Sequence, residues 1–194
     1  MCNRFLRLFA VLLCCASAFS FSHAFEGSAA LPFQKIEGCE WIEHTGNDGD
    51  SFHVRANGKE FIFRLYFVDT PESASDNLVE SRIADQAKYF GINEEQSLEL
   101  GKQATAFTRQ KLSGPFTVYT RWRNALGRSK LPRYYAFVVL GTEDLAQSLV
   151  SHGLARIYGT RTPLPDGSDS RAFLENLGRI EADAKSRQLG GWHQ

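Results

Sequence analysis

Apolar and polar residues alternate over residues 37–56, on either side of the turn Asn47-Asp48-Gly49-Asp50. This period of two predicts a β-hairpin, because successive side chains of a strand point to opposite faces. A second turn, Asn57-Gly58, leads into residues 61–68, which are apolar on both faces and are followed by Pro71. Asn-Gly is a strong hairpin signal, and a strand apolar on both faces is expected where a small barrel closes over its core. Three consecutive strands are therefore predicted.

The hydrophobic pattern then changes to that of a helix and later returns to that of strands. Apolar positions recur at helical spacing over residues 77–113, with a break at Gly91-Ile92-Asn93. The further elements expected are a fourth strand over 116–122, a fifth over 133–140, a short helix capped by Thr142 and ending at His152-Gly153, and a last helix from Asp169 or Ser170 to Leu189. The pattern predicts an α+β fold with five strands and about three to four helices.

The composition is that of a folded protein with no overall charge. The 194 residues are 43% hydrophobic and carry 22 Lys+Arg against 22 Asp+Glu. That length and composition indicate one compact domain and exclude a disordered or low-complexity chain. Nucleic-acid binding cannot be inferred from net charge, so it would depend on a local site. Such a site is suggested by a stretch between Glu99 and Glu143 that contains no acid but holds Lys102, Arg109, Lys111, Arg121, Arg123, Arg128, Lys130 and Arg133.

Those eight basic residues fall into two groups. Lys102, Arg109 and Lys111 fit the solvated face of the predicted helix, whereas the loop over 121–133 is better suited to attract phosphate.

Residues 1–24 have the features of a signal peptide. Arg4 and Arg7 precede an apolar run over 9–21, and small residues follow at possible cleavage points up to Ala24. The run is shorter than the ~20 apolar residues of a membrane span, although an uncleaved anchor stays open. We expect an exported protein, periplasmic or secreted, with no stable membrane association after cleavage. Residues 25–36 would be a short linker and 37–192 the folded domain, which we expect to be a monomer.

Cleavage would also change the charge and the cysteine content. Loss of Arg4 and Arg7 leaves 20 basic against 22 acidic residues, a net charge of −2. Cys39 would be the one remaining cysteine, so no intramolecular disulfide is expected and Cys39 is interpreted as a small buried hydrophobic residue.

Four charged residues carry the candidate chemistry. Asp50 and Asp69 each lie where a strand meets a turn, so their carboxylates could converge on a hard cation. Arg64 lies inside an apolar strand, where a charge needs a polar pocket or a partner. Glu72 follows Asp69 by three residues and is placed to act as a base that activates water. The simpler interpretation is that the carboxylates of the Asp-Gly-Asp motif cap their turn and that Arg64 forms a buried ion pair with Asp69 or Glu72.

Taken in order, these motifs resemble the staphylococcal (micrococcal) nuclease family. They are Asp48-Gly49-Asp50-Ser51 and Arg64-Leu65-Tyr66-Phe67-Val68-Asp69-Thr70-Pro71-Glu72. Weaker similarities to the helices of the family follow in matching order, so that the resemblance spans roughly residues 37–192. It implies a five-stranded OB-fold barrel that binds Ca²⁺ and hydrolyses phosphodiester bonds of DNA and/or RNA, leaving 3′-phosphate ends. The nucleic acid would be the partner, as substrate.

The resemblance also implies roles for individual residues. Asp50 and Asp69 would be Ca²⁺ ligands, and the carbonyl of Thr70 would be a third. Glu72 would orient or deprotonate the attacking water, while Arg64 would hold the scissile phosphate.

A second catalytic arginine is expected at the start of the fifth strand, where this sequence departs from the family pattern. Arg133 keeps the register with the strand, and Arg128 keeps the local Gly-Arg pair. We favour Arg133, because its distance from a rigid strand should set its reach. The side chains expected to contact substrate are Arg121, Arg123, Lys130 and Tyr158.

Two other functions stay open on the sequence. One is a non-catalytic OB-fold module that binds nucleic acid or a protein, which the slightly acidic mature chain and the altered loop before Arg133 favour. The other is a structural domain stabilised by Ca²⁺ that has no polymer substrate.

Overall fold

The computed structural model describes residues 32–76, 79–127 and 129–193. The predicted signal peptide over 1–24, most of the predicted linker and Arg128 therefore lie outside the described residues. Within the described ranges, none of the helices combines the length and the apolar character that crossing a membrane requires.

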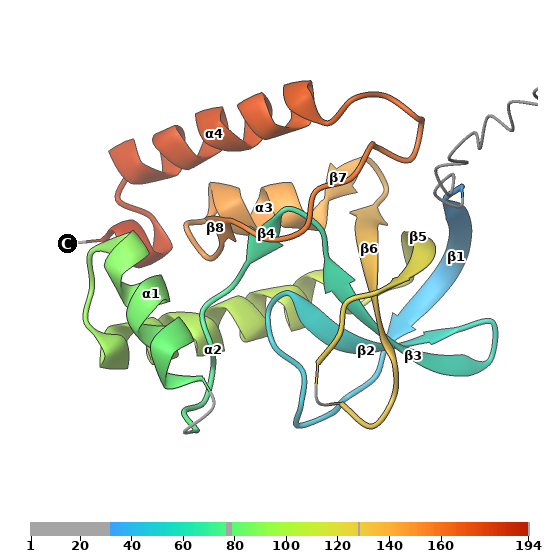
Figure 1. The fold of residues 1–194 in the computed structure, drawn as a ribbon, viewed down its shortest axis with the longest axis horizontal. Coiled ribbons are helices and arrows are strands. Elements are labelled where there is room, and N and C mark those ends of the chain that lie inside the picture. The colour runs from blue at the N-terminus through green and yellow to red at the C-terminus, as the bar shows by residue number, and fades with distance from the viewer. Residues whose placement is uncertain (1–31, 77–78, 128, 194) are drawn as a thin grey trace, which may run out of the picture. The chain divides into compact units, whose positions relative to one another are not determined.

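Five strands form a closed barrel (Figure 1). They follow the order β3-β2-β1-β5-β6, with antiparallel neighbours, and a parallel pairing of β3 with β6 joins the two ends. A closed sheet has no free edge, and its inward-facing side chains fill the interior. The barrel strands are β1 (Gln34–Trp41), β2 (Ser51–Ala56), β3 (Lys59–Leu65), β5 (Phe116–Asn124) and β6 (Arg133–Leu140).

The barrel begins earlier than the sequence pattern indicates. β1 starts at Gln34, inside the segment 25–36 that the sequence analysis treats as a linker. Gln34 and Lys35 are exposed and lack an alternating pattern, but they pair with Thr120 and Tyr119 of β5. Pairing between distant strands extends β1 where the local sequence carries no strand signal.

The third predicted strand is interrupted after Leu65. Phe67 has a φ of 69°, so the chain leaves the barrel instead of continuing to residue 68. The next two residues form β4 (Val68–Asp69), which pairs antiparallel with β8 (Arg156–Ile157) in a separate small sheet. This break turns the end of the Arg64-to-Glu72 motif toward the helices.

Within the described ranges four α-helices accompany the barrel, in agreement with the predicted three to four. The predicted break at residues 91–93 separates the first two helices, and Asn93 caps the second through a capping box with Gln96. The remaining elements are α1 (Glu80–Phe90), α2 (Glu94–Lys111), β7 (Glu143–Asp144), α3 (Leu145–Ser151), α4 (Arg171–Ser186) and the 3₁₀ turn η1 (Gly190–Trp192).

The N-terminal cap of α3 differs from the prediction. Asp144, and not Thr142, accepts the backbone N–H of Gln147, because Glu143 and Asp144 first pair with β6 as β7. The overall architecture is nevertheless the predicted one, an α+β fold built on a five-stranded OB-type barrel.

Candidate active site

Two buried aspartates and one arginine form the centre of the site. Asp50 and Asp69 are each 1% exposed. The guanidinium of Arg64 donates from Nη2 to both, at 3.1 Å from Asp50 Oδ2 and 2.7 Å from Asp69 Oδ1. The charge of Asp50, above all, raises the pKa of Arg64. The predicted cation-binding carboxylates and the predicted phosphate-binding arginine therefore converge.

Strand register and the break after Leu65 explain this convergence. Ser51 at the start of β2 is paired with Arg64 on β3, which places Asp50 beside the end of that strand. The backbone N–H of Thr70 donates to Asp50 Oδ2 at 3.1 Å, fixing the chain that follows β4 against the same carboxylate. Two motifs 14 residues apart in sequence are thus connected by hydrogen bonds.

The Asp-Gly-Asp turn is held tightly before β2. Asp48 Oδ1 accepts the backbone N–H groups of Asp50 and Ser51, so Asp48 caps the turn in the way that the simpler interpretation proposed for this motif. A Cβ added to Gly49 would lie 2.8 Å from the side chains of Ala104 and Thr70, which requires glycine there. Burial and then the charge of Asp50 raise the pKa of Asp48.

Asp69 accepts hydrogen bonds on both of its oxygens. Oδ1 accepts from Arg64 and from Arg82 Nη2, the latter at 3.1 Å, and Oδ2 accepts from Gln86 Nε2 and Arg156 Nε, both at 2.9 Å. Burial alone would raise the pKa of Asp69, but Arg64 and the Gln86 hydrogen bond oppose it, and the net effect lowers the pKa. Asp69 is therefore held as a charged carboxylate.

Glu72 lies at the edge of this cluster and is less tightly held. Its side chain is 16% exposed, and Arg82 Nη1 lies 2.6 Å from Oε1. Burial, only partly offset by Arg82, raises the pKa of Glu72. A carboxylate with a raised pKa and access to solvent is a suitable general base.

Arg133 is brought to the same region from β6. Its Nε donates to the carbonyl of Leu126 at 3.0 Å and its Nη1 to Ser51 Oγ at 3.3 Å. Burial and then the charge of Arg64 lower the pKa of Arg133, so two guanidiniums lie close together. Two neighbouring guanidiniums repel each other, and an anion bound between them would relieve that repulsion. Arg128, the alternative, lies outside the described residues.

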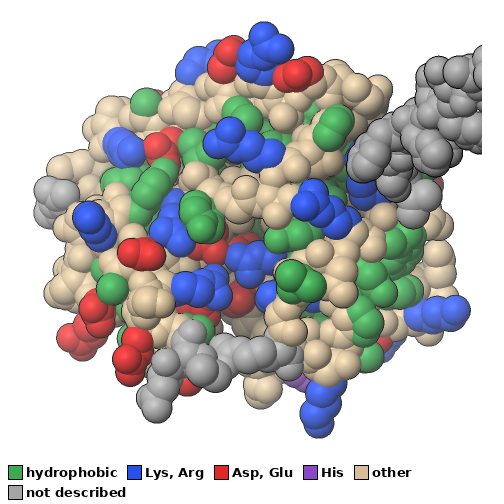
Figure 2. Space-filling model, viewed as in Figure 1, with side chains coloured by type: hydrophobic (Ala, Val, Ile, Leu, Met, Phe, Trp, Pro, Cys, Tyr) green, Lys and Arg blue, Asp and Glu red, His purple; other side chains and the backbone are tan. Residues whose placement is uncertain are grey.

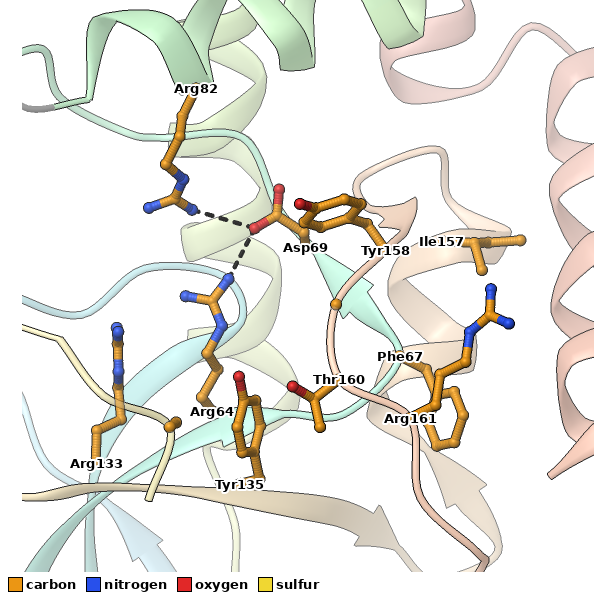
Figure 3. Close-up of a pocket in the computed structure, with 12 residues that line it drawn as sticks. Arg64, Phe67, Asp69, Arg82, Arg133, Tyr135, Ile157, Tyr158, Thr160 and Arg161 are labelled. Carbon is orange, nitrogen blue, oxygen red and sulfur yellow. Dashed lines mark hydrogen bonds and ion pairs between the residues drawn. The ribbon is translucent and has the colours of Figure 1, made fainter. Parts of the chain in front are cut away.

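Two clefts open at this arginine cluster. One has a volume of about 590 Å³ and the other about 1080 Å³. Among the described residues, those that line both clefts are Arg64, Arg82 and Arg133. Figure 2 shows basic side chains gathered around a hollow in this face of the molecule, and Figure 3 shows Arg64 and Arg82 pointing toward Asp69.

The four predicted substrate-contacting residues fall into two groups. Lys130 lines the larger cleft, and Tyr158, which is 61% exposed, lines the smaller one. Arg121 instead packs over the ring of Phe33, with 4.1 Å from Cζ to the ring centroid, and neither Arg121 nor Arg123 is among the residues described as lining these clefts. Both lie on β5, and Arg123 Cζ is 6.0 Å from the ring centroid of Tyr135, which lines the smaller cleft.

Three residues of the cluster are missed by the sequence analysis. Arg82 and Gln86 lie on α1 and Arg156 on β8, all outside the two motifs that indicated the site. One signal was available: Gln86 is a polar residue on the apolar face of a predicted helix, between Ile83 and Ala87, and it is fully buried.

The chemistry of the donors is compatible with Ca²⁺. Asp50, Asp69 and the Thr70 carbonyl supply the oxygen ligands that Ca²⁺ prefers, and Thr70 Oγ1 is buried there with no hydrogen-bond partner. Arg64 Nη2 already places positive charge between the two carboxylates. Within the described ranges, no three or more His, Cys, Asp or Glu side chains gather as a metal-binding group. Carbonyl and water oxygens would therefore have to complete any coordination.

The barrel and the arginine–carboxylate cluster together define a nuclease-like or nucleic-acid-binding class of OB-fold protein. This chain belongs to the family described as staphylococcal nuclease homologue, which it matches over residues 62–194. It is also similar to the uncharacterized protein MJ1439 of Methanocaldococcus jannaschii, with 26% identity over 156 residues, covering 75% of this chain and 68% of that protein.

Proposed function

We propose that this chain is an exported, Ca²⁺-dependent nuclease that hydrolyses phosphodiester bonds of DNA and/or RNA and leaves 3′-phosphate ends. The observation that carries the proposal is the position of Arg64, Arg82 and Arg133, which line both clefts, next to the carboxylate of Glu72. A phosphodiester at this junction would meet three guanidiniums and one candidate base.

The arginines would bind the phosphate and stabilise its transition state. Arg64 is held by two buried carboxylates, so its guanidinium is oriented before substrate arrives. Arg133 has no acidic partner among the described ion pairs and donates to a carbonyl and a hydroxyl. Its charge is available to an incoming anion. Preoriented positive charge is the main means by which proteins accelerate phosphoryl transfer.

Glu72 would accept the proton of the attacking water. Its raised pKa increases its strength as a base, and Arg82 holds one carboxylate oxygen while the side chain keeps contact with solvent. Bound Ca²⁺, held by Asp50, Asp69 and the Thr70 carbonyl, would supply further positive charge at the phosphate.

The two clefts would accommodate the nucleotides next to that phosphate. Tyr158 lines the smaller cleft and is exposed, so its ring offers an aromatic face for base stacking, whereas Tyr135 beside it is stacked on Tyr66. Lys130 lines the larger cleft and offers a contact to a second phosphate.

A non-catalytic nucleic-acid-binding module is the second candidate. It is favoured by Leu126, a large apolar residue that is 75% exposed in the loop before Arg133. The family pattern has polar residues that contact substrate at this place. Such a module would bind oligonucleotides in a salt-dependent manner and would not cleave them.

Cleavage assays separate the two candidates. Residues 25–194 are incubated with single-stranded DNA, double-stranded DNA and RNA, in Ca²⁺ and in excess chelator, beside a Glu72→Gln variant. The proposal requires Ca²⁺-dependent cleavage, 3′-phosphate ends and a large loss of turnover in the variant. Salt-sensitive binding without cleavage, by a folded protein, would establish the module instead.

A further inference from the structure

Gln86 on α1 contacts three of the residues to which the proposed function assigns roles. Its side chain is 0% exposed. Nε2 donates to Asp69 Oδ2 at 2.9 Å and to the Thr70 carbonyl at 3.0 Å, while Oε1 accepts the backbone N–H of Glu72 at 3.0 Å. Every hydrogen-bonding atom of this amide is therefore directed at the segment from Asp69 to Glu72.

That segment is held by side chains and by packing against α2, and not by regular secondary structure. β4 ends at Asp69, and the backbone from Thr70 to Glu72 belongs to no strand or helix. Pro71 has no backbone N–H to donate. The amide of Gln86 bonds to the backbone on both sides of Pro71, and so it determines where the Thr70 carbonyl and the Glu72 side chain point.

Arg82, four residues before Gln86, lies on the same face of the helix and acts on the other end of Glu72. Arg82 Nη1 lies 2.6 Å from the Glu72 carboxylate, whereas Gln86 holds the Glu72 backbone. Residues four apart on a helix share a face, so α1 contacts the candidate base at two points.

We infer that Gln86 is a positioning residue for the active site, and that α1 is a part of that site and not an external addition to the barrel. This inference rests on the proposed function. Through its hydrogen bonds, Gln86 orients the proposed base Glu72 and two of the proposed Ca²⁺ ligands, Asp69 and the carbonyl of Thr70.

A purely structural role makes a different prediction. If Gln86 only filled space and paired buried polar groups, its replacement would lower the free energy of unfolding without a specific effect on turnover or on Ca²⁺ affinity. Positioning groups around a metal site typically change affinity or activity by about 10–100-fold when they are lost.

The test replaces the amide with side chains that cannot donate. Gln86→Leu removes all three hydrogen bonds, and Gln86→Met does so while keeping an unbranched side chain of similar length. Ser148→Ala is the matched control, because Ser148 lies in α3, away from the site, and is only 5% exposed, and its Oγ hydrogen-bonds to Glu143 Oε1 at 2.5 Å and to the Asp144 carbonyl at 2.9 Å.

Three quantities are measured for each protein: kcat and KM on single-stranded DNA, the Ca²⁺ dissociation constant by calorimetry without nucleic acid, and the midpoint of urea unfolding. We expect both Gln86 variants to lower kcat by about 10–100-fold and to weaken Ca²⁺ binding by about 10-fold, with KM nearly unchanged. Ser148→Ala should lower the unfolding midpoint alone.

Folded Gln86 variants with wild-type kcat and Ca²⁺ affinity would overturn the inference, as would variants that both fail to fold. If the wild type binds Ca²⁺ but does not cleave, the proposed function fails, and the Ca²⁺ affinities alone then decide the role of Gln86. A wild-type protein that neither cleaves nor binds Ca²⁺ would overturn both proposals.

Discussion

Replacement of Gly101 by alanine is expected to damage the active site from a helix that contributes no side chain to it. Gly101 lies in α2 and is buried where the helix packs on the backbone of Pro71 and Glu72. A Cβ at this position would lie 2.6 Å from the Pro71 carbonyl oxygen and closer still to the carbonyl of Glu72. Its backbone conformation is not one that requires glycine, so the effect of Gly101→Ala comes from this contact.

The structure sets the size of the effect. Ordinary contact of a Cβ begins at 3.4 Å, so the Pro71–Glu72 backbone or α2 must move by at least 0.8 Å, the difference between 3.4 and 2.6 Å. A displacement of about 1 Å at reacting groups lowers turnover by about 100-fold. Overpacking destabilises by about 1–3 kcal/mol, and alanine in a helix recovers about 1 kcal/mol. We therefore expect a loss of about 0–2 kcal/mol in the free energy of unfolding.

Gly178→Ala is the matched control, because Gly178 lies in α4 and a Cβ there would meet nothing within 4 Å. That variant should gain about 1 kcal/mol of stability with unchanged turnover. The two variants are compared by kcat on single-stranded DNA in Ca²⁺ and by urea unfolding. A Gly101→Ala protein with wild-type kcat would refute the argument that α2 sets the position of Glu72.

Three further predictions concern single side chains. Glu72→Gln should lower kcat by about 10²–10⁴-fold while calorimetry shows Ca²⁺ binding retained, and an active variant would exclude Glu72 as the base. Arg133→Ala should lower kcat/KM by about 10²–10³-fold; if only Arg128→Ala does so in the same assay, Arg128 is the second catalytic arginine. Burial raises the pKa of the Cys39 thiol from 9.0 to about 11. The buried neutral thiol therefore stabilises the fold below pH 9, and this stabilisation is lost as the pH rises toward 11. The loss is on the order of 3 kcal/mol of stability, so stability, measured by urea unfolding, should fall less steeply between pH 9 and 11 in Cys39→Ala, in which tyrosine ionisation still contributes.

Much of the fold follows from local sequence patterns. The hairpin over 37–56, the helix break at residues 91–93 and the strand over 133–140 are each visible as a hydrophobic period or a turn signal and are each present. The less accurate predictions lie where tertiary pairing overrides a local preference. β1 extends to Gln34 because β5 pairs with it, and Asp144 replaces Thr142 as the cap because Glu143 and Asp144 pair with β6 and the helix begins only after them.

For the site, the sequence alone predicted Asp50, Arg64, Asp69 and Glu72, because their residue types and order follow a specific family motif, and the structure brings these four residues together. It could not identify Arg82, Gln86 or Arg156, which reach Asp69 from 13 to 87 residues away. Local patterns specify which stretches become helices and strands and which carry charge. The tertiary structure decides which side of α1 faces β4, how β3 registers with β6, and which of the many arginines meet at one junction, because those choices depend on packing between segments that are distant in the chain.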